Sequence, residues 1–281
     1  MTQPASSIPN TLTIAGVDPS GGAGILADIK AMSALGAYGT AVIAALTAQN
    51  TRGVTGISPV PPEFVQQQID TLFDDVRIDA VKIGMLGQQA VTRVVADRMA
   101  HWKPAHLVLD PVMIAKSGDT LLERSAIVEL RDSLVPQASM ITPNLPEAGV
   151  LLDARPAETL KEMRRMAERL RRLLADDGRR WVFLKGGHLP GNETIDVLHD
   201  GDRMIELPGT RIATRNTHGT GCTLSAALAA LLPQFPDVPE AALRAKAYLV
   251  EAIVRSGELN VGGGHGPVHH FHALWRPANR L

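Results

Sequence analysis

The sequence predicts an α/β fold in which a central, mostly parallel sheet is flanked by helices in a single domain. Apolar stretches of strand length alternate with segments of helical periodicity along the chain, which is typical of repeated βα units. The 281 residues are 45% hydrophobic and 20% charged, which supplies a large core and is too little charge for a disordered chain. We expect a flexible N-terminus at residues 1–10, the folded domain at 11–276 and a short tail at 277–281.

Six short apolar stretches are the candidate strands of the sheet. In chain order they are residues 12–15, 41–48, 80–83, 107–109, 140–141 and 181–184. Their apolar residues are consecutive rather than alternating, so we expect strands buried on both faces, as in a parallel sheet covered by two layers of helices. Two further strands, at 194–198 and 203–207, are predicted to form an antiparallel hairpin around the turn sequence Asp200-Gly201-Asp202.

Helical segments separate these strands. In the first, residues 24–35, the side chains of Ile25, Ile29, Met32 and Leu35 share one face that should pack on the sheet. Residues 160–174 have an apolar stripe and an opposite face rich in arginine, including Arg171, which we interpret as a solvated surface. The last helices are predicted at 221–232 and 239–257.

Charge and cysteine content exclude several classes of partner. The 28 basic and 29 acidic residues leave a net charge of −1, so no long-range field favours nucleic acid or an anionic membrane. The single cysteine, Cys222, cannot form an internal disulfide. Residues 1–10 carry no signal-peptide features, and the most apolar stretch is about half the length of a membrane-spanning helix. We therefore expect a cytoplasmic protein.

A glycine-rich loop at residues 16–24 follows the first strand and leads into a helix, where glycines let the backbone approach a ligand closely. Its Gly22-x-Gly24-x-x-Ala27 spacing also fits a dinucleotide fingerprint, so an NAD enzyme is an alternative. That interpretation requires an acidic residue near the end of the second strand. Gln49 and Asn50 lie there instead, which disfavours it.

A second loop, residues 217–223, opens a helix of small residues. The first amide groups of a helix lack internal partners and lie at the positive end of its dipole, so this loop suits a phosphate. No segment has the spacing of a P-loop, which disfavours a Walker-type NTPase. The alternative is that Gly219 and Gly221 only shape a tight turn.

A third loop, residues 142–147, places an amide and a carboxylate three residues apart at a helix start. Asn144 and Glu147 could hold hydrated Mg²⁺ against nucleotide phosphates, since magnesium takes few protein ligands and keeps waters. They could equally form a capping box, with Asn144 capping the helix and Glu147 reaching back.

Eight motifs, in register from about residue 12 to residue 275, give the chain a family resemblance. They are DPSGGAGI (18–25), AQNT (48–51), KIGML (82–86), DPVM (110–113), KSG (116–118), TPNLPE (142–147), KGGH (185–188) and NTHGTGCTLS (216–225). The sequence resembles the ribokinase superfamily and, within it, the hydroxymethylpyrimidine/phosphomethylpyrimidine kinases of thiamine biosynthesis. The resemblance implies a ribokinase-like fold, a homodimer, and two MgATP-dependent phosphorylations, first of 4-amino-5-hydroxymethyl-2-methylpyrimidine and then of its monophosphate.

The resemblance also implies roles for individual residues at the carboxyl edge of the sheet. The implied catalytic residues are Gly219, Thr220, Gly221 and Cys222, around the transferred phosphoryl group, and Lys185, on phosphate. The implied substrate contacts are Gly16, Asp28, Gln49 and Met85, and the implied magnesium ligands are Asn144, Glu147 and Asp110. Residues 116–119 would form a mobile flap over the site.

Cys222 occupies the position at which sugar kinases of the superfamily carry a catalytic aspartate. A helix start favours the thiolate, so Cys222 could act as a weak base or hold the substrate alcohol by a hydrogen bond. The second phosphorylation uses a phosphate oxygen that needs little base. Loss of the thiol should therefore affect the first step more.

Three alternatives remain at this point. The closest is pyridoxal kinase or a dual-activity enzyme, because these relatives share the scaffold and act on a similar aromatic alcohol. A catalytically silent pyrimidine sensor is disfavoured by the intact glycine loop and Lys185. The histidines at 265, 269, 270 and 272 suggest zinc, but no cysteine or carboxylate cluster accompanies them.

Overall fold

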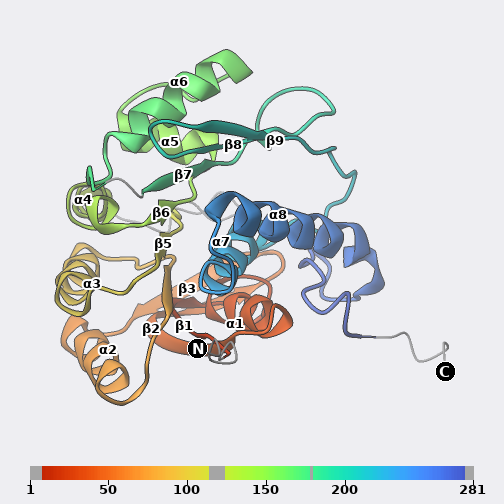
Figure 1. The fold of residues 1–281 in the computed structure, drawn as a ribbon. Helices are drawn as coiled ribbons and strands as arrows, with labels where there is room; N and C mark the ends of the chain where they lie inside the picture. Colours follow the sequence, from red (N-terminus) through yellow and green to blue (C-terminus); the bar gives the residue numbers. More distant parts are fainter. Residues whose placement is uncertain (1–7, 114–123, 178–179, 276–281) are drawn as a thin grey trace, which may run out of the picture.

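The computed structural model describes residues 8–113, 124–177 and 180–275, and a nine-stranded sheet organises this part of the chain (Figure 1). The strands are β1 (Asn10–Val17), β2 (Tyr38–Asn50), β3 (Gly53–Pro59), β4 (Ala80–Ile83), β5 (Leu107–Leu109), β6 (Met140–Ile141), β7 (Trp181–Leu184), β8 (Asp196–His199) and β9 (Met204–Leu207). The predicted flap at 116–119 lies outside the described residues, as do residues 1–7 and 276–281 at the predicted ends.

Helices connect the strands in the alternation that the sequence predicts. The α-helices are α1 (Gly24–Ala34), α2 (Pro62–Asp75), α3 (Gln89–Trp102), α4 (Arg124–Glu129), α5 (Leu145–Leu152), α6 (Leu160–Arg171), α7 (Thr220–Leu231) and α8 (Val238–Val254). Shorter turns of other helix types are η1 (Leu130–Leu134), η2 (Val135–Gln137) and η3 (Arg255–Glu258).

The sheet runs in the order β3-β2-β1-β4-β5-β6-β7-β8-β9. Strands β2, β1, β4, β5, β6 and β7 are parallel to their neighbours, whereas β3 pairs antiparallel with β2, and β8 and β9 continue antiparallel from β7. All the parallel strands therefore end at one edge, where ligands bind in open α/β sheets. The fold is α/β with a mostly parallel sheet, as predicted.

Two layers of helices cover the sheet (Figure 1). Helices α1, α7 and α8 bury one apolar core, in which alanines and leucines of α7 pack closely on the strands. Helices α2 to α6 bury the larger core on the other face. Both faces of the central strands are thus removed from water, which explains why β4, β5, β6 and β7 are buried at every position.

The edge of the sheet at β2 and β3 differs from the prediction. Strand β2 is longer than expected and alternates exposed with partly buried residues at its far end, where Leu46 is half exposed. The sequence analysis missed β3, because its glycines and proline resemble a loop and few of its side chains are buried. Asn10, expected in the flexible N-terminus, is instead the first residue of β1.

One arginine on α6 is buried although the helical pattern predicts an exposed face. Arg171 donates from Nε to the carbonyl oxygen of Asp200, 2.8 Å away, and from Nη1 to that of Ala175. The end of α6 thereby contacts the turn between β8 and β9. The prediction that Arg171 is exposed was wrong because the β8–β9 hairpin covers the end of this helix face, which helical periodicity alone assigns to solvent.

The C-terminal histidines make separate contacts. His270 is buried, and its Nε2 lies 3.0 Å from the hydroxyl of Thr223 on α7. His269 Nε2 is 4.0 Å from a carboxylate oxygen of Glu258. Across the described part of the chain, no group of three or more His, Cys, Asp or Glu side chains is placed to hold a metal.

His270 should make the stability of the fold depend on pH. Burial, followed by the nearby Lys30 charge, lowers the pKa of His270 to about 3 from its ordinary value of 6.5. The unfolded chain therefore binds the proton more readily between these values, so stability is complete above pH 6.5 and is lost as the pH falls through this window. Between pH 7 and pH 4.5, the thermal midpoint of His270→Gln should fall less than that of the wild type. The midpoint of His101→Gln, which changes an exposed histidine, should fall as much as that of the wild type. Equal pH slopes for the wild type and His270→Gln would contradict this.

No helix in the described ranges has both the length and the apolar character needed to cross a membrane.

Candidate active site

A cleft of about 770 Å³ opens at the carboxyl edge of the parallel strands. Gly16 near the end of β1, Asp110 directly after β5 and Lys185 directly after β7 all line it. The turn into α7 closes another side of the cleft. Residues far apart in sequence therefore meet because parallel strands end together.

Nearly all of the sequence-predicted site residues line this cleft. They are Gly16, Gln49, Met85, Asp110, Asn144, Glu147, Lys185, Gly219, Thr220, Gly221 and Cys222. Asp28 is the exception.

The loop at residues 217–223 has the open helix start that its sequence predicts. Gly219 is the N-cap of α7, with φ 74° and no capping side chain, so no side chain satisfies the first-turn amides of the helix. A Cβ on Gly219 would lie 1.8 Å from the carbonyl oxygen of Gly22. Glycine is therefore required at this position for two reasons: the backbone is left-handed, and the glycine-rich loop lies too close for a side chain.

A hydrogen bond between two side chains joins the same two loops. Asp18 Oδ2 and His218 Nε2 are 2.7 Å apart, and the carboxylate also accepts hydrogen bonds from Ser20 and from the amide of Ala23. Burial opposes ionisation, but the hydrogen bonds from His218 and Ser20 outweigh it and lower the pKa of Asp18. Sequence analysis did not single out this pair, because the two residues are separated by 200 positions.

Lys185 lies beside the loop at residues 217–223. Its Nζ is 3.1 Å from Asp110 Oδ1 and 3.8 Å from Glu147 Oε2, and it is 3.3 Å from the point at which a Cβ on Gly221 would lie. Burial disfavours the ammonium, but Asp110 and Glu147 more than compensate and raise the pKa of Lys185. A fixed cation and the first turn of α7 thus face the same space.

Asn144 and Glu147 form the capping box that was the alternative to metal binding. The side-chain oxygen of Asn144 accepts from the amide of Glu147, and Glu147 Oε2 accepts from the amide of Asn144, both at 2.8 Å. Burial, reinforced by Asp110, raises the pKa of Glu147 to about 7. The cap occupies the side-chain oxygen of Asn144 and one oxygen of Glu147, so the second oxygen of Glu147 and the carboxylate of Asp110 are the ligands that would fit Mg²⁺.

Cys222 departs from the expectation drawn from the helix dipole. Burial raises the pKa of its thiol to about 11, while the ammonium of Lys82 and a backbone hydrogen bond from Gly24 act in the opposite direction. At neutral pH the side chain is therefore a thiol. Local sequence predicts the dipole, but burial of the sulfur depends on how α7 packs against α1 and the sheet.

Asp28, predicted as a substrate contact, does not line the cleft and is the internal partner of a lysine. It is fully buried in α1, and its Oδ2 accepts from Lys82 Nζ at 2.8 Å and from the Thr13 hydroxyl at 2.6 Å. Lys82, on β4, is the member of the pair that lines the cleft. Helical periodicity places Asp28 on the inner face of α1 but does not reveal this cation.

The predicted pyrimidine side of the cleft has two features. Met85 packs against Gly16, whose absent side chain leaves room for the thioether, and the Gly16 amide donates to the Met85 carbonyl oxygen at 3.0 Å. The amide oxygen of Gln49 lies 3.1 Å from the Thr47 hydroxyl. An apolar thioether and an oriented amide suit a flat heteroaromatic ring.

The far end of the cleft contains residues that the sequence analysis did not identify. Lys246 of α8 forms an ion pair with Asp196 at 2.9 Å, and Ile212 and Val250 add apolar surface. These residues were missed because no motif marks them, and Val250 resembles a core position on its helix.

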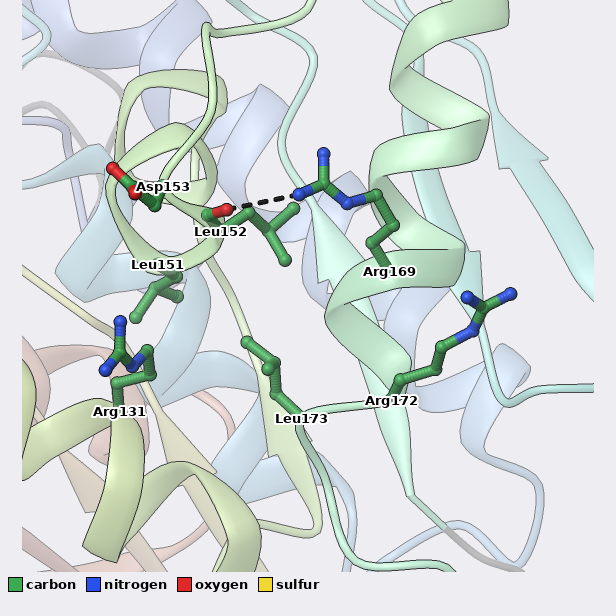
Figure 2. Close-up of a pocket in the computed structure, with 7 residues that line it drawn as sticks. All are labelled: Arg131, Leu151, Leu152, Asp153, Arg169, Arg172 and Leu173. Atoms are coloured by element: carbon green, nitrogen blue, oxygen red, sulfur yellow. Dashed lines mark hydrogen bonds between the residues drawn. The ribbon is translucent and has the colours of Figure 1, made fainter.

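A smaller pocket of about 380 Å³ lies where α5, α6 and η1 meet (Figure 2). Arg169 reaches across it and donates to the carbonyl oxygen of Leu152 at 3.1 Å, while Arg131 pairs with Asp132. None of the sequence-predicted site residues lines this pocket. Arg169 contacts the end of α5 and Arg131 contacts a neighbouring carboxylate, so we assign both arginines a structural role.

The sheet order and the cleft at its carboxyl edge are those of a small-molecule phosphotransferase with a ribokinase-like fold. The family model for phosphomethylpyrimidine kinase matches residues 18–269, and the chain belongs to this family.

Individual relatives agree with this family. The chain is 53% identical to the hydroxymethylpyrimidine/phosphomethylpyrimidine kinase of Escherichia coli K12, over 95% of this chain and 98% of that one. It is similar to solved structures of a Clostridium difficile 630 phosphomethylpyrimidine kinase (TM-score 0.77, 38% identity, 87% and 99% of the two chains) and of an ADP complex of Bacillus subtilis pyridoxal kinase (TM-score 0.86, 33% identity, 95% and 99%).

Proposed function

We propose that this protein transfers phosphoryl groups from ATP to 4-amino-5-hydroxymethyl-2-methylpyrimidine and then to its monophosphate, in thiamine biosynthesis. The observation that carries the proposal is the closeness of Lys185 to the first turn of α7. Phosphoryl transfer depends mainly on positioning and on neutralising charge, and this arrangement supplies a cation and amide donors together. The high identity to kinases with these two substrates supports the choice of alcohol.

In this proposal the cleft is divided between two ligands. The pyrimidine lies against Gly16, Met85 and Gln49, and the nucleotide extends from the α7 loop toward Lys246 and α8. Glu147 and Asp110 are the residues that would hold Mg²⁺. When bound, the metal neutralises phosphate charge, a role that Lys185 and the loop amides share.

The direct test uses purified protein, MgATP and either the hydroxymethylpyrimidine or pyridoxal, with products identified by mass. We expect the mono- and diphosphorylated pyrimidine. Pyridoxal phosphate as the dominant product would favour the pyridoxal kinase alternative. The absence of every phosphorylated product would favour the silent pyrimidine sensor.

Cys222→Ala should slow the first phosphorylation by about 10-fold or more and the second by less than about threefold. The first nucleophile is an alcohol that must lose a proton, whereas the second is a phosphate oxygen that is already ionised. Single-turnover rates with the alcohol and with the monophosphate measure the two steps separately. Equal slowing of both would contradict a proton-handling or alcohol-orienting role for this thiol.

We propose further that two copies of the chain associate through the sheet edge formed by β2 and β3. Strand β3 is the outer strand of the sheet, where backbone groups are available for pairing with another chain, and Leu46 and Ile57, on β2 and β3, are 50% and 44% exposed. Light scattering at micromolar protein should give the mass of a dimer, and Leu46→Glu should shift it toward the monomer. A monomer mass for the wild type would contradict this assembly.

A further inference from the structure

Asp18 and His218 both line the cleft, and the proposed function does not yet account for them. Asp18 belongs to the glycine-rich loop, and His218 directly precedes the N-cap of α7. Both residues are buried, and Asp18 Oδ2 lies 2.7 Å from His218 Nε2. The backbones of the same two loops also meet at Gly22 and Gly219, with no room for a side chain between them. This junction is therefore held by a side-chain hydrogen bond and by close backbone packing.

Two helices begin at this junction, and within the described part of the chain neither start is capped by its own N-cap side chain. These N-cap residues are Ala23 for α1 and Gly219 for α7. A conventional cap holds a helix start, but it also occupies one of the free amides. The start of α7 therefore needs a different support if its amides are to remain available to a ligand.

One carboxylate supplies this support to both helices. Asp18 Oδ2 accepts hydrogen bonds from the amide of Ala23, at 3.0 Å, and from His218 Nε2. The backbone of His218 is held as well, because its amide donates to the carbonyl oxygen of Gly266 at 3.1 Å. The ring lies against Gly22, where a Cβ would be 2.3 Å from Cδ2. The residue before the α7 N-cap is thus fixed at both its ring and its backbone.

We propose that His218 and Asp18 are positioning residues for phosphoryl transfer. Their hydrogen bond sets the first turn of α7 against the start of α1 and leaves the α7 amides free for the transferred group. The inference rests on the proposed function. A displacement of about 1 Å in groups that position a reaction can lower its rate by about 100-fold. Because both phosphorylations move the same group, loss of this hydrogen bond should slow both.

The test replaces His218 in two ways. His218→Leu removes the ring nitrogen, while Asp18 keeps its hydrogen bonds from Ser20 and Ala23. We expect kcat of both phosphorylations to fall by about 10- to 100-fold and KM for MgATP to change by less than about threefold. His218→Gln places an amide donor within reach of Asp18 and should recover most of the lost rate.

Two results of this series would overturn the proposal. The first is a His218→Gln enzyme as slow as His218→Leu, because the hydrogen bond would then not be what holds the helix start. The second is a raised KM for MgATP with an unchanged kcat, which would make His218 a nucleotide contact and not a positioning residue.

His199→Leu is the matched control for lost stability. His199 is a second buried histidine, and its Nδ1 lies 2.8 Å from the carbonyl oxygen of Arg203. It is not among the described residues that line the cleft. Its replacement should lower the thermal midpoint and keep both rates within about threefold of wild type. If His199→Leu slowed both reactions as much as His218→Leu at an equal loss of midpoint, the rates would follow stability and the proposal would be wrong.

A double variant determines whether the two residues act as one pair. Asp18→Asn presents an amino group to donors that the carboxylate accepts from, so it should slow both phosphorylations by at least about 10-fold. Asp18→Asn/His218→Leu should be slower than Asp18→Asn by less than about twofold, because the shared hydrogen bond is already lost. Independent, multiplying effects would overturn the proposal.

Hydrogen exchange of the free protein tests the junction without substrate. In Asp18→Asn, peptides covering residues 217–224 should exchange about 10-fold faster than in wild type, although the substitution is 200 positions away. Peptides covering β4 should be unchanged. A wild-type exchange rate at residues 217–224 would overturn the proposal. A wild-type enzyme that makes no phosphorylated pyrimidine would refute the proposed function instead, and the exchange result would still stand.

Discussion

Gly221→Ala is expected to reduce both phosphorylation rates by about 100-fold or more while leaving the fold at least as stable as wild type. A Cβ at this position would lie 3.3 Å from Lys185 Nζ and 3.5 Å from Asp110 Oδ2. The methyl group would therefore enter the space between the α7 amides and the cation, which the transferred phosphoryl group needs. Alanine is otherwise favoured over glycine inside a helix by about 1 kcal/mol.

This combination separates a catalytic effect from a folding effect. Thermal unfolding should show an unchanged or raised midpoint, and single-turnover assays should show the loss of both steps. Gly257→Ala is the matched control, since nothing lies within 4 Å of its Cβ position. Gly219→Ala would not be informative, because it collides with the backbone of Gly22. A Gly221→Ala enzyme with nearly normal rates would show that the phosphoryl group is held elsewhere.

The site was predictable from sequence largely because its residues follow strand ends. Asp110 and Lys185 come directly after short apolar strands, and a parallel sheet brings such positions to one edge whatever their separation in the chain. The open helix start at residues 217–223 was predictable for a similar reason, since the amides of a helix start do not depend on tertiary contacts.

The errors arose where a side chain's role depends on its partner across the fold. Asp28 has the expected position on α1, but its partner Lys82 comes from β4, 54 residues away, and takes the carboxylate out of the cleft. Cys222 has the expected helix start, but burial controls the pKa of its thiol. Neither the partner nor the burial can be obtained from the local sequence pattern.

The sheet edge shows the same limitation for secondary structure. Strand β3 pairs with β2 by antiparallel hydrogen bonds, although its own residues are mostly exposed. An apolar pattern in the sequence indicates which residues are buried. A strand at the sheet edge that is held by backbone hydrogen bonds has few buried side chains, so its sequence lacks this pattern. The hairpin β8–β9 was predictable because its turn sequence is distinctive.

Lys185→Met is expected to lower the rates of both phosphorylations by about 100- to 1,000-fold. The side chain supplies a point charge beside the first turn of α7, so its loss removes stabilisation of the phosphoryl group in either step. The variant also leaves Asp110 and Glu147 without the cation that lies 3.1 Å and 3.8 Å from them. Their mutual repulsion should then raise the pKa of Glu147 further and weaken binding of nucleotide phosphates.

Two comparisons make the Lys185 result specific. Lys161→Met removes an exposed lysine from α6 and should leave both rates unchanged. In contrast to Cys222→Ala, Lys185→Met should slow the alcohol and monophosphate reactions alike, because the charge acts on the group in transit and not on the nucleophile. Its thermal midpoint must be measured beside the rates, since the two carboxylates become uncompensated. A folded Lys185→Met enzyme that keeps rates within about threefold of wild type would contradict the placement of the phosphoryl group between this lysine and α7.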